Sequence, residues 1–99
     1  MPKVLFTISY DIRPEKREEY LSLARDMKAH LADSKGKNYA IYEQKGKKNG
    51  FFEMFVCASQ EEFDKLEDDQ DDILEQMVAR LDGMLLERKM KYVTFHEVA

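Results

Sequence analysis

The stretch Gly50–Leu66, GFFEMFVCASQEEFDKL, decides the fold of this chain. Its first part predicts a β-strand over 51–58, in which alternate side chains point to opposite faces of a sheet. Both faces of this strand are apolar: one carries Phe51, Phe55 and Cys57, and the other carries Phe52, Met54, Val56 and Ala58. A chain of 99 residues has helices enough to cover one face of a sheet, so the second face needs a different cover.

A helix follows the strand directly. Ser59 and Glu62 form the S-x-x-E capping box, which places the helix start at Ser59. The apolar residues beyond it recur at helical spacing: Phe63, Leu66, Ile73, Leu74, Met77, Val78 and Leu81. The acidic run EDDQDD interrupts this stripe, so we expect a break near Asp69, in a position to cap a second helix. Gly83 is expected to weaken the helix or to begin a turn.

The rest of the chain supplies a long helix and three more strands. Alternating side chains predict strands at 3–12, 38–44 and 88–98. Pro14 suits the first turn of a helix, and apolar residues at helical spacing continue from there to near Ser34. Asn49-Gly50 is a hairpin signal. The order β-α-β-β-α-β predicts an α+β, ferredoxin-like domain spanning 1–99, with a four-stranded antiparallel sheet and helices on one face.

The second face of this sheet is expected to bind another copy of itself. It would expose Leu5 and the apolar side chains of the other strands as one contiguous patch, larger than soluble monomers usually leave in water. Two sheets packed face to face about a two-fold axis would bury it. The sequence therefore predicts a homodimer, in which two domains form an α/β barrel.

Composition limits the classes of function. A net charge of −4 argues against nucleic acid as a partner, because phosphate binding needs a basic surface. No apolar run approaches the roughly 20 residues of a membrane span, and the chain enters a strand with no leader sequence, which predicts a cytoplasmic protein. The single cysteine, Cys57, excludes an intrachain disulfide and a multi-cysteine metal site, and we expect it to pack as a small apolar residue.

Two stretches together resemble the dimeric α/β-barrel superfamily, and within it the antibiotic-biosynthesis-monooxygenase-like group. They are LFTISYDIRPEKREEYLSLAR, at 5–25, and FFEMFVCASQEEFDKL, at 51–66, and the resemblance extends over essentially the whole chain. The small polar cap, the acids and the aromatic residue of the group's pattern match Ser59, Glu61, Glu62 and Phe63. The resemblance implies the fold derived above.

The chain also departs from the group's pattern. The usual Trp falls at Phe55 or Cys57, and the usual helix His is Leu66. The haem-degrading branch relies on a Trp and a first-strand Asn. This chain has no Trp and no Asn before Asn38, which argues against that branch.

The activity implied by the resemblance is cofactor-independent monooxygenation of a small phenol- or quinol-type molecule. Such chemistry needs an apolar pocket, a base and hydrogen-bond donors for the developing oxyanion. The candidate catalytic residues are Tyr10, Tyr92 and His96, and the candidate pocket residues are Phe6, Ile8, Tyr42 and Phe63. Tyr10 and His96 would converge if the first and last strands are neighbours. No metal or other cofactor is expected.

The alternative is a non-catalytic homodimer that binds a small ligand or a protein partner, or that serves as a stress-responsive protein. A cavity with polar groups between sheet and helices would favour the enzyme, and a cavity filled by Phe and Met side chains would favour the alternative. His30, among charged residues, is expected to be solvated.

Two other interpretations are weaker. EDDQDD lacks the order and the glycine of a calcium loop. NGFFEMFV is similar to the third strand of RNA-recognition domains, but the chain is acidic and Asn49 replaces the basic residue expected before the glycine.

Overall fold

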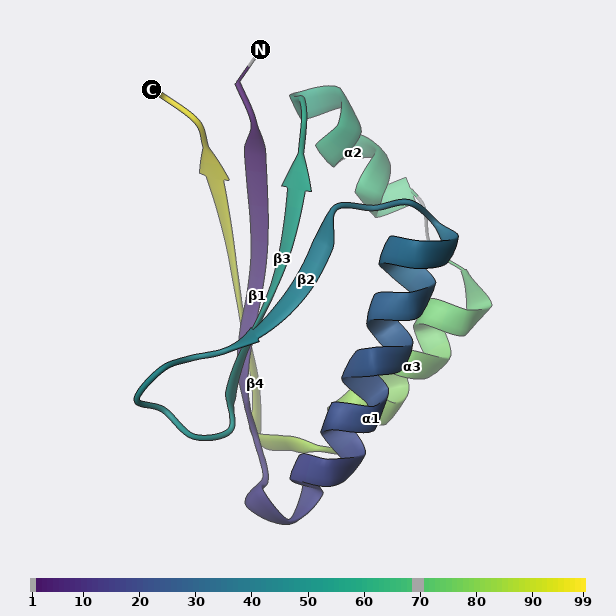
Figure 1. The fold of residues 1–99 in the computed structure, drawn as a ribbon, viewed down its shortest axis with the longest axis vertical. Coiled ribbons are helices and arrows are strands. Elements are labelled where there is room, and N and C mark those ends of the chain that lie inside the picture. The colour runs from purple at the N-terminus through teal and green to yellow at the C-terminus, as the bar shows by residue number, and fades with distance from the viewer. Residues whose placement is uncertain (1, 69–70) are drawn as a thin grey trace.

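Four antiparallel strands form one sheet in the order β2-β3-β1-β4, and helices cover one of its faces (Figure 1). The computed structural model describes residues 2–68 and 71–99, apart from the side chain of Glu67, and these statements concern that part of the chain. The strands are β1 (Val4–Ile12), β2 (Tyr39–Glu43), β3 (Gly50–Cys57) and β4 (Leu85–His96). The helices are η1 (Pro14–Lys16), α1 (Arg17–Lys28), η2 (Ala29–Ser34), α2 (Gln60–Asp68) and α3 (Asp72–Asp82). The predicted ferredoxin-like order is confirmed.

Local capping explains where the last two helices begin. Ser59 Oγ accepts the Glu62 N–H at 3.2 Å, so the predicted cap at Ser59 is present. Glu62 Oε2 accepts the N–H of Ala58, the residue before the cap, at 3.0 Å. The acidic run does divide the helical segment, because α2 ends at Asp68. The cap of α3 is Asp71, whose carboxylate accepts the Leu74 N–H at 2.7 Å. The expected cap, Asp69, lies outside the described residues.

The long first helix ends as predicted at Ser34, where its last turn is wound as the π-helix η2. Its buried face presents Tyr20, Leu23, Met27 and Leu31 to the sheet. Gly83 caps the end of α3, in agreement with the expected helix end. None of the described helices is long and apolar enough to cross a membrane.

The last strand begins three residues earlier than predicted. Leu85 pairs with Ile12, but the ladder shifts register before Met90 pairs with Tyr10. Glu87 and Arg88, which lie between these two pairs, have φ values of 60° and 54°. Such left-handed backbone marks a bulge rather than a continuous strand, and the alternation of side chains is lost there.

The strand register overturns one expectation about the site. β1 and β4 are neighbours, as the predicted convergence required, but His96 pairs with Val4 and Tyr10 pairs with Met90. Six residues of strand separate the two positions, which is about 20 Å. The prediction that Tyr10 and His96 converge is therefore wrong.

The uncovered face of the sheet, which we call the open sheet face, is largely apolar. The strand pairings place the following side chains on this face: Leu5, Thr7 and Ser9 of β1, Phe52, Met54 and Val56 of β3, Ala40 and Tyr42 of β2, and Val93 and Phe95 of β4. The side chains of Tyr42 and Phe95 are about half exposed. The expectation of an apolar second face is thus met in the single chain.

Candidate functional site

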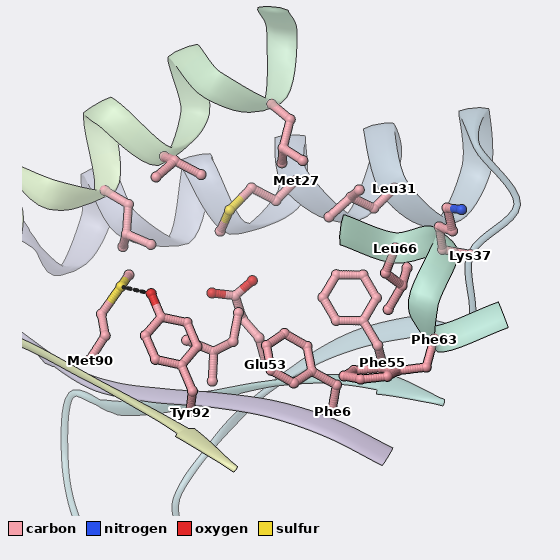
Figure 2. A pocket seen from close by; sticks show the side chains of 14 residues that line it. Phe6, Met27, Leu31, Lys37, Glu53, Phe55, Phe63, Leu66, Met90 and Tyr92 are labelled. Carbon is pink, nitrogen blue, oxygen red and sulfur yellow. Dashed lines mark hydrogen bonds between the residues drawn. The ribbon is translucent and has the colours of Figure 1, made fainter. Parts of the chain in front are cut away.

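A cavity of about 300 Å³ lies between the sheet and the helices (Figure 2). Its helical wall is aliphatic and is formed by side chains that include Met27, Leu31, Leu74 and Leu81. The volume is at the lower end of the range for small-molecule sites, roughly 300–1,000 Å³. The cavity is therefore large enough for a small organic molecule and is not filled by the surrounding Phe and Met side chains.

The sheet side of the cavity is aromatic. The ring of Phe6 stacks between those of Phe55 and Tyr92, with both pairs of centroids 6.2 Å apart and interplanar angles of 29° and 14°. Phe63 of α2 closes this row, its ring 5.7 Å from that of Phe6. The register explains the row. Phe6 of β1 pairs with Phe55 of β3, and Tyr92 of β4 pairs with Ile8, the next residue of β1 on the same face of the sheet. Nearly parallel rings across three strands form a surface that suits a planar ring.

One carboxyl group is buried at this aromatic surface. Glu53 pairs with Ile8 and Ile41 in the middle of the sheet, faces the helices and is 5% exposed. Tyr10 donates a hydrogen bond to Glu53 Oε2 at 2.7 Å, and Tyr39 donates one to Glu53 Oε1 at 2.5 Å. Both carboxyl oxygens are therefore held by hydroxyl groups from neighbouring strands.

A third tyrosine completes the cluster. The hydroxyl oxygens of Tyr20 and Tyr10 are 2.7 Å apart. Because the Tyr10 proton is directed at Glu53, Tyr20 donates to the Tyr10 oxygen. Tyr20 is fully buried in α1, so this hydrogen bond joins the helix to the carboxyl group through β1.

Burial governs the protonation of this cluster. Loss of solvent raises the pKa of Glu53, and the hydrogen bonds from Tyr39 and Tyr10 oppose that rise because they stabilise the ionised form. Burial, with the nearby Glu53 charge as a second cause, also raises the pKa of Tyr10 and of Tyr39. The tyrosines are therefore protonated donors at neutral pH.

The structure brings together only part of the predicted site. Phe6, Ile8, Phe63 and Tyr92 line the cavity. The hydroxyl of Tyr92 donates to the sulfur of Met90 at 3.2 Å. Tyr10 does not line the cavity, but its hydroxyl group donates a hydrogen bond to Glu53, which does.

Two predicted residues lie elsewhere. Tyr42 pairs with Phe52 and belongs to the open sheet face, so its placement in the pocket is wrong. The residues of β2 that face the helices are the alternate ones, which include Tyr39 and Ile41, paired with Phe55 and Glu53. His96 is exposed at the far end of β4.

The sequence analysis missed Glu53, although the alternation in GFFEMFVC puts it between Phe51 and Phe55 on the helix-facing side. A carboxyl group in that position was the available signal for a buried polar site. His30 was also placed wrongly: its side chain is 13% exposed and its Nε2 lies 2.9 Å from Asp71 Oδ2. Cys57 is buried, as expected. Within the described residues, no group of three or more His, Cys, Asp or Glu side chains is arranged to hold a metal ion.

Solved structures with this fold include proteins described as oxygenases. No protein-family profile matches the chain, and no curated protein sequence matches it. A structure described as an antibiotic biosynthesis monooxygenase superposes with a TM-score of 0.75 at 15% identity, covering 100% of both chains. SnoaB from Streptomyces nogalater, a cofactor-independent oxygenase solved as a mutant, superposes with a TM-score of 0.70 at 14% identity, covering 94% of this chain and 90% of SnoaB.

A dimeric ferredoxin-like protein of unknown function from Thermobifida fusca superposes with a TM-score of 0.62 at 16% identity, covering 95% of this chain and 90% of its own. These likenesses establish a shared fold. The chain thus has the ferredoxin-like fold found among dimeric α/β-barrel and antibiotic-biosynthesis-monooxygenase-like proteins, as the sequence resemblance implied.

Proposed function

We propose that this protein is a cofactor-independent monooxygenase-like enzyme that acts on a small phenol- or quinol-type molecule in the cavity between sheet and helices. The observation that carries the proposal is a cavity with an aromatic row on one side, aliphatic side chains on the other and the buried carboxyl group of Glu53 between them. The oxygenases that share the fold support the same class of reaction.

The shape of the cavity suits a flat apolar ring. A substrate ring packed on Phe6 and Tyr92 would be covered on its other side by Met27 and Leu81. Its hydroxyl group would meet Glu53, which provides the polar contact that orients a ligand in an otherwise apolar site. Tyr92 adds a hydroxyl group at the exposed side of the cavity.

The substrate can supply every electron of the reaction. A phenol with a free para position and O₂ give the para-quinone and water: one oxygen atom enters the ring and the other leaves as water. The four electrons that reduce O₂ come from the ring, and for that reason we propose that neither a metal nor a flavin takes part.

We further propose that the active form is a homodimer joined through the open sheet face. Covering Tyr42, Phe95 and the apolar residues between them would remove a contiguous patch from water. A neighbour described as a dimeric ferredoxin-like protein is compatible with this assembly.

A non-catalytic ligand-binding protein is the competing function. It would be favoured by a cavity filled with Phe and Met side chains, whereas the cavity is open and has a carboxyl group in its wall. That polar group favours the enzyme.

Oxygen consumption with α-naphthol as the substrate tests the proposal. We expect the wild-type protein to consume O₂ and to form the para-quinone in equal amounts without added metal or flavin, and chelation to leave the rate unchanged. Saturable binding of α-naphthol without oxygen consumption would support the ligand-binding protein instead.

A further inference from the structure

We propose that Glu53 is the general base that removes the hydroxyl proton of the substrate, and that Tyr10 and Tyr39 position its carboxylate. This inference rests on the proposed function, because it assigns a residue to the proton transfer which that reaction requires. Neither Glu53 nor Tyr39 was among the candidate catalytic residues that the sequence suggested, which were Tyr10, Tyr92 and His96.

The first argument is geometric. Glu53 extends from the middle of β3 into the space between the sheet and the helices, beside the rings of Phe6 and Tyr92 (Figure 2). An ionised carboxylate has about four acceptor positions, and Tyr10 and Tyr39 occupy one on each oxygen. The remaining acceptor positions are available to a hydroxyl group that enters the cavity.

The second argument concerns the direction of the hydrogen bonds. Tyr10 and Tyr39 both donate to Glu53, and Tyr20 donates to Tyr10, so the cluster is arranged for an acceptor at its centre. When Glu53 is ionised, these donors stabilise its charge and hold both of its oxygens in one orientation, which is what a general base requires.

The third argument is the chemical environment. The titratable groups that contact Glu53 or share its cavity are Tyr10 from β1, Tyr39 from β2, Tyr20 from α1 through Tyr10, Tyr92 from β4, and Lys37 from the segment before β2. The residues that η2, α2 and α3 contribute to the cavity lining are all apolar. Lys37 lies at the end of the cavity near Leu66 and Phe63, away from the carboxyl group in Figure 2. Burial makes Glu53 a stronger base than an exposed carboxylate, and the tyrosine hydrogen bonds moderate that effect.

The residues predicted from sequence fit this role less well. His96 pairs with Val4 at the far end of β1, about 20 Å of strand from Tyr10. Tyr92 lines the cavity, but its hydroxyl group donates to the sulfur of Met90. Glu53 is the carboxyl group among the residues that line the cavity.

The proton balance closes with solvent water as the carrier at the para carbon. The Glu53 carboxylate takes the substrate's hydroxyl proton, and the electron-rich ring forms a C–O bond with O₂ at the para carbon. Water protonates the resulting peroxide and takes the para C–H proton as the O–O bond breaks. The departing hydroxide is protonated to water, Glu53 returns its proton to solvent, and the quinone is left.

The test compares wild-type protein with Glu53→Gln, which keeps the side-chain shape but cannot take a proton. We expect α-naphthol turnover to fall by roughly 100-fold to 10,000-fold, the usual contribution of a general base. Glu75→Gln, which makes the same change at an exposed residue of α3 that does not line the cavity, is the matched control and should leave turnover unchanged. Circular dichroism and thermal melting establish that each variant is folded.

A second measurement does not depend on turnover. The probe is p-nitrophenol, whose phenolate is yellow, titrated into each protein at a pH below the pKa of the free compound. The wild-type protein should increase the yellow fraction on binding, because Glu53 takes the proton. Glu53→Gln should bind the probe without this colour.

The outcomes separate the two proposals. Oxidation of α-naphthol at equal rates by both proteins would overturn the role of Glu53 and leave the oxygenase function standing. Glu53-dependent ionisation of p-nitrophenol without oxidation of α-naphthol would support the base and count against the oxygenase. Absence of probe binding by wild-type protein, or equal colour with both proteins, would overturn the base.

Positioning by the tyrosines has its own readout. Tyr10→Phe and Tyr39→Phe each remove one hydrogen-bond donor to Glu53, which raises the pKa of its carboxyl group. The turnover of each variant should therefore be low at the pH where the wild-type protein is active and should be restored at higher pH, where Glu53 ionises. A loss of turnover that is equal at every pH would contradict positioning.

Discussion

The hydroxyl group of Tyr10 lies 2.7 Å from Glu53 Oε2, and this hydrogen bond joins β1 to β3 beneath the helices. The two residues are 43 positions apart in the sequence. The contact holds a buried carboxyl group against the cavity wall that is rich in aromatic rings, so it connects the core of the domain to the candidate site.

Removing the Tyr10 hydroxyl group should destabilise the protein. Tyr10→Phe leaves one oxygen of a buried carboxyl group and the Tyr20 hydroxyl without their partner, which costs about 1–3 kcal/mol in the free energy of unfolding. Urea denaturation measures the change. Tyr92→Phe is the control, since Tyr92 is 59% exposed and lies on the other face from the proposed interface, so its change should alter stability by less than about 0.5 kcal/mol. Equal stability of the two variants would mean that the Tyr10 hydrogen bond contributes nothing net.

The pKa of Glu53 predicts how stability depends on pH. Its pKa in the folded protein is raised above the value in the unfolded chain, so the folded state holds the proton more tightly. The stabilisation from this group is fully present below the unfolded pKa and is lost as the pH rises through the folded pKa. The free energy of unfolding of wild-type protein, measured against that of Glu53→Gln, should therefore fall as the pH increases from acid towards neutral. A difference that does not change with pH would contradict the raised pKa.

The pair of Arg17 and Glu43 should show the opposite pH dependence. Arg17 binds both carboxylate oxygens of Glu43, at 2.6 and 3.0 Å, and these hydrogen bonds are the main cause that lowers the pKa of Glu43 to about 2. A depressed pKa contributes stability above the unfolded value, and this contribution is lost as the pH falls towards 2. Thermal melting of wild-type protein and Glu43→Gln should differ at neutral pH, and the difference should shrink on acidification. Both residues are exposed enough that the difference is expected to be small.

A charge on the open sheet face should dissociate the proposed homodimer. Phe95→Glu alters a side chain that is 50% exposed in the single chain, so the domain should still fold. Sedimentation of wild-type protein should give twice the chain mass of 11.7 kDa, and the variant should give the single mass. Ile73→Glu is the matched control, because Ile73 is 53% exposed on α3, away from that face. A wild-type monomer would refute the dimer.

The order of elements and their capping were predictable because those signals are local. The cap at Ser59 and the stop near Ser34 depend on a few neighbouring residues. The two apolar faces of β3 were equally visible, since alternation along one strand assigns each side chain to a face.

The composition of the candidate site was predictable only in part. Alternation along β1 placed Phe6 and Ile8 towards the helices. It did not place Tyr42, because the phase of the short strand β2 depends on its pairing with β3. The same limitation produced the error over Tyr10 and His96, since no pattern within β1 or β4 indicates which residues become partners.

The sequence by itself therefore determined the order of the elements and the uncovered apolar face, because each follows from short-range periodicity, whereas the pocket was an expectation that came from the family resemblance. The tertiary structure alone decided that Tyr10, Tyr20 and Tyr39 meet at Glu53. Those four residues come from three strands and a helix, and only the register between strands and the docking of α1 bring their polar atoms within hydrogen-bonding distance.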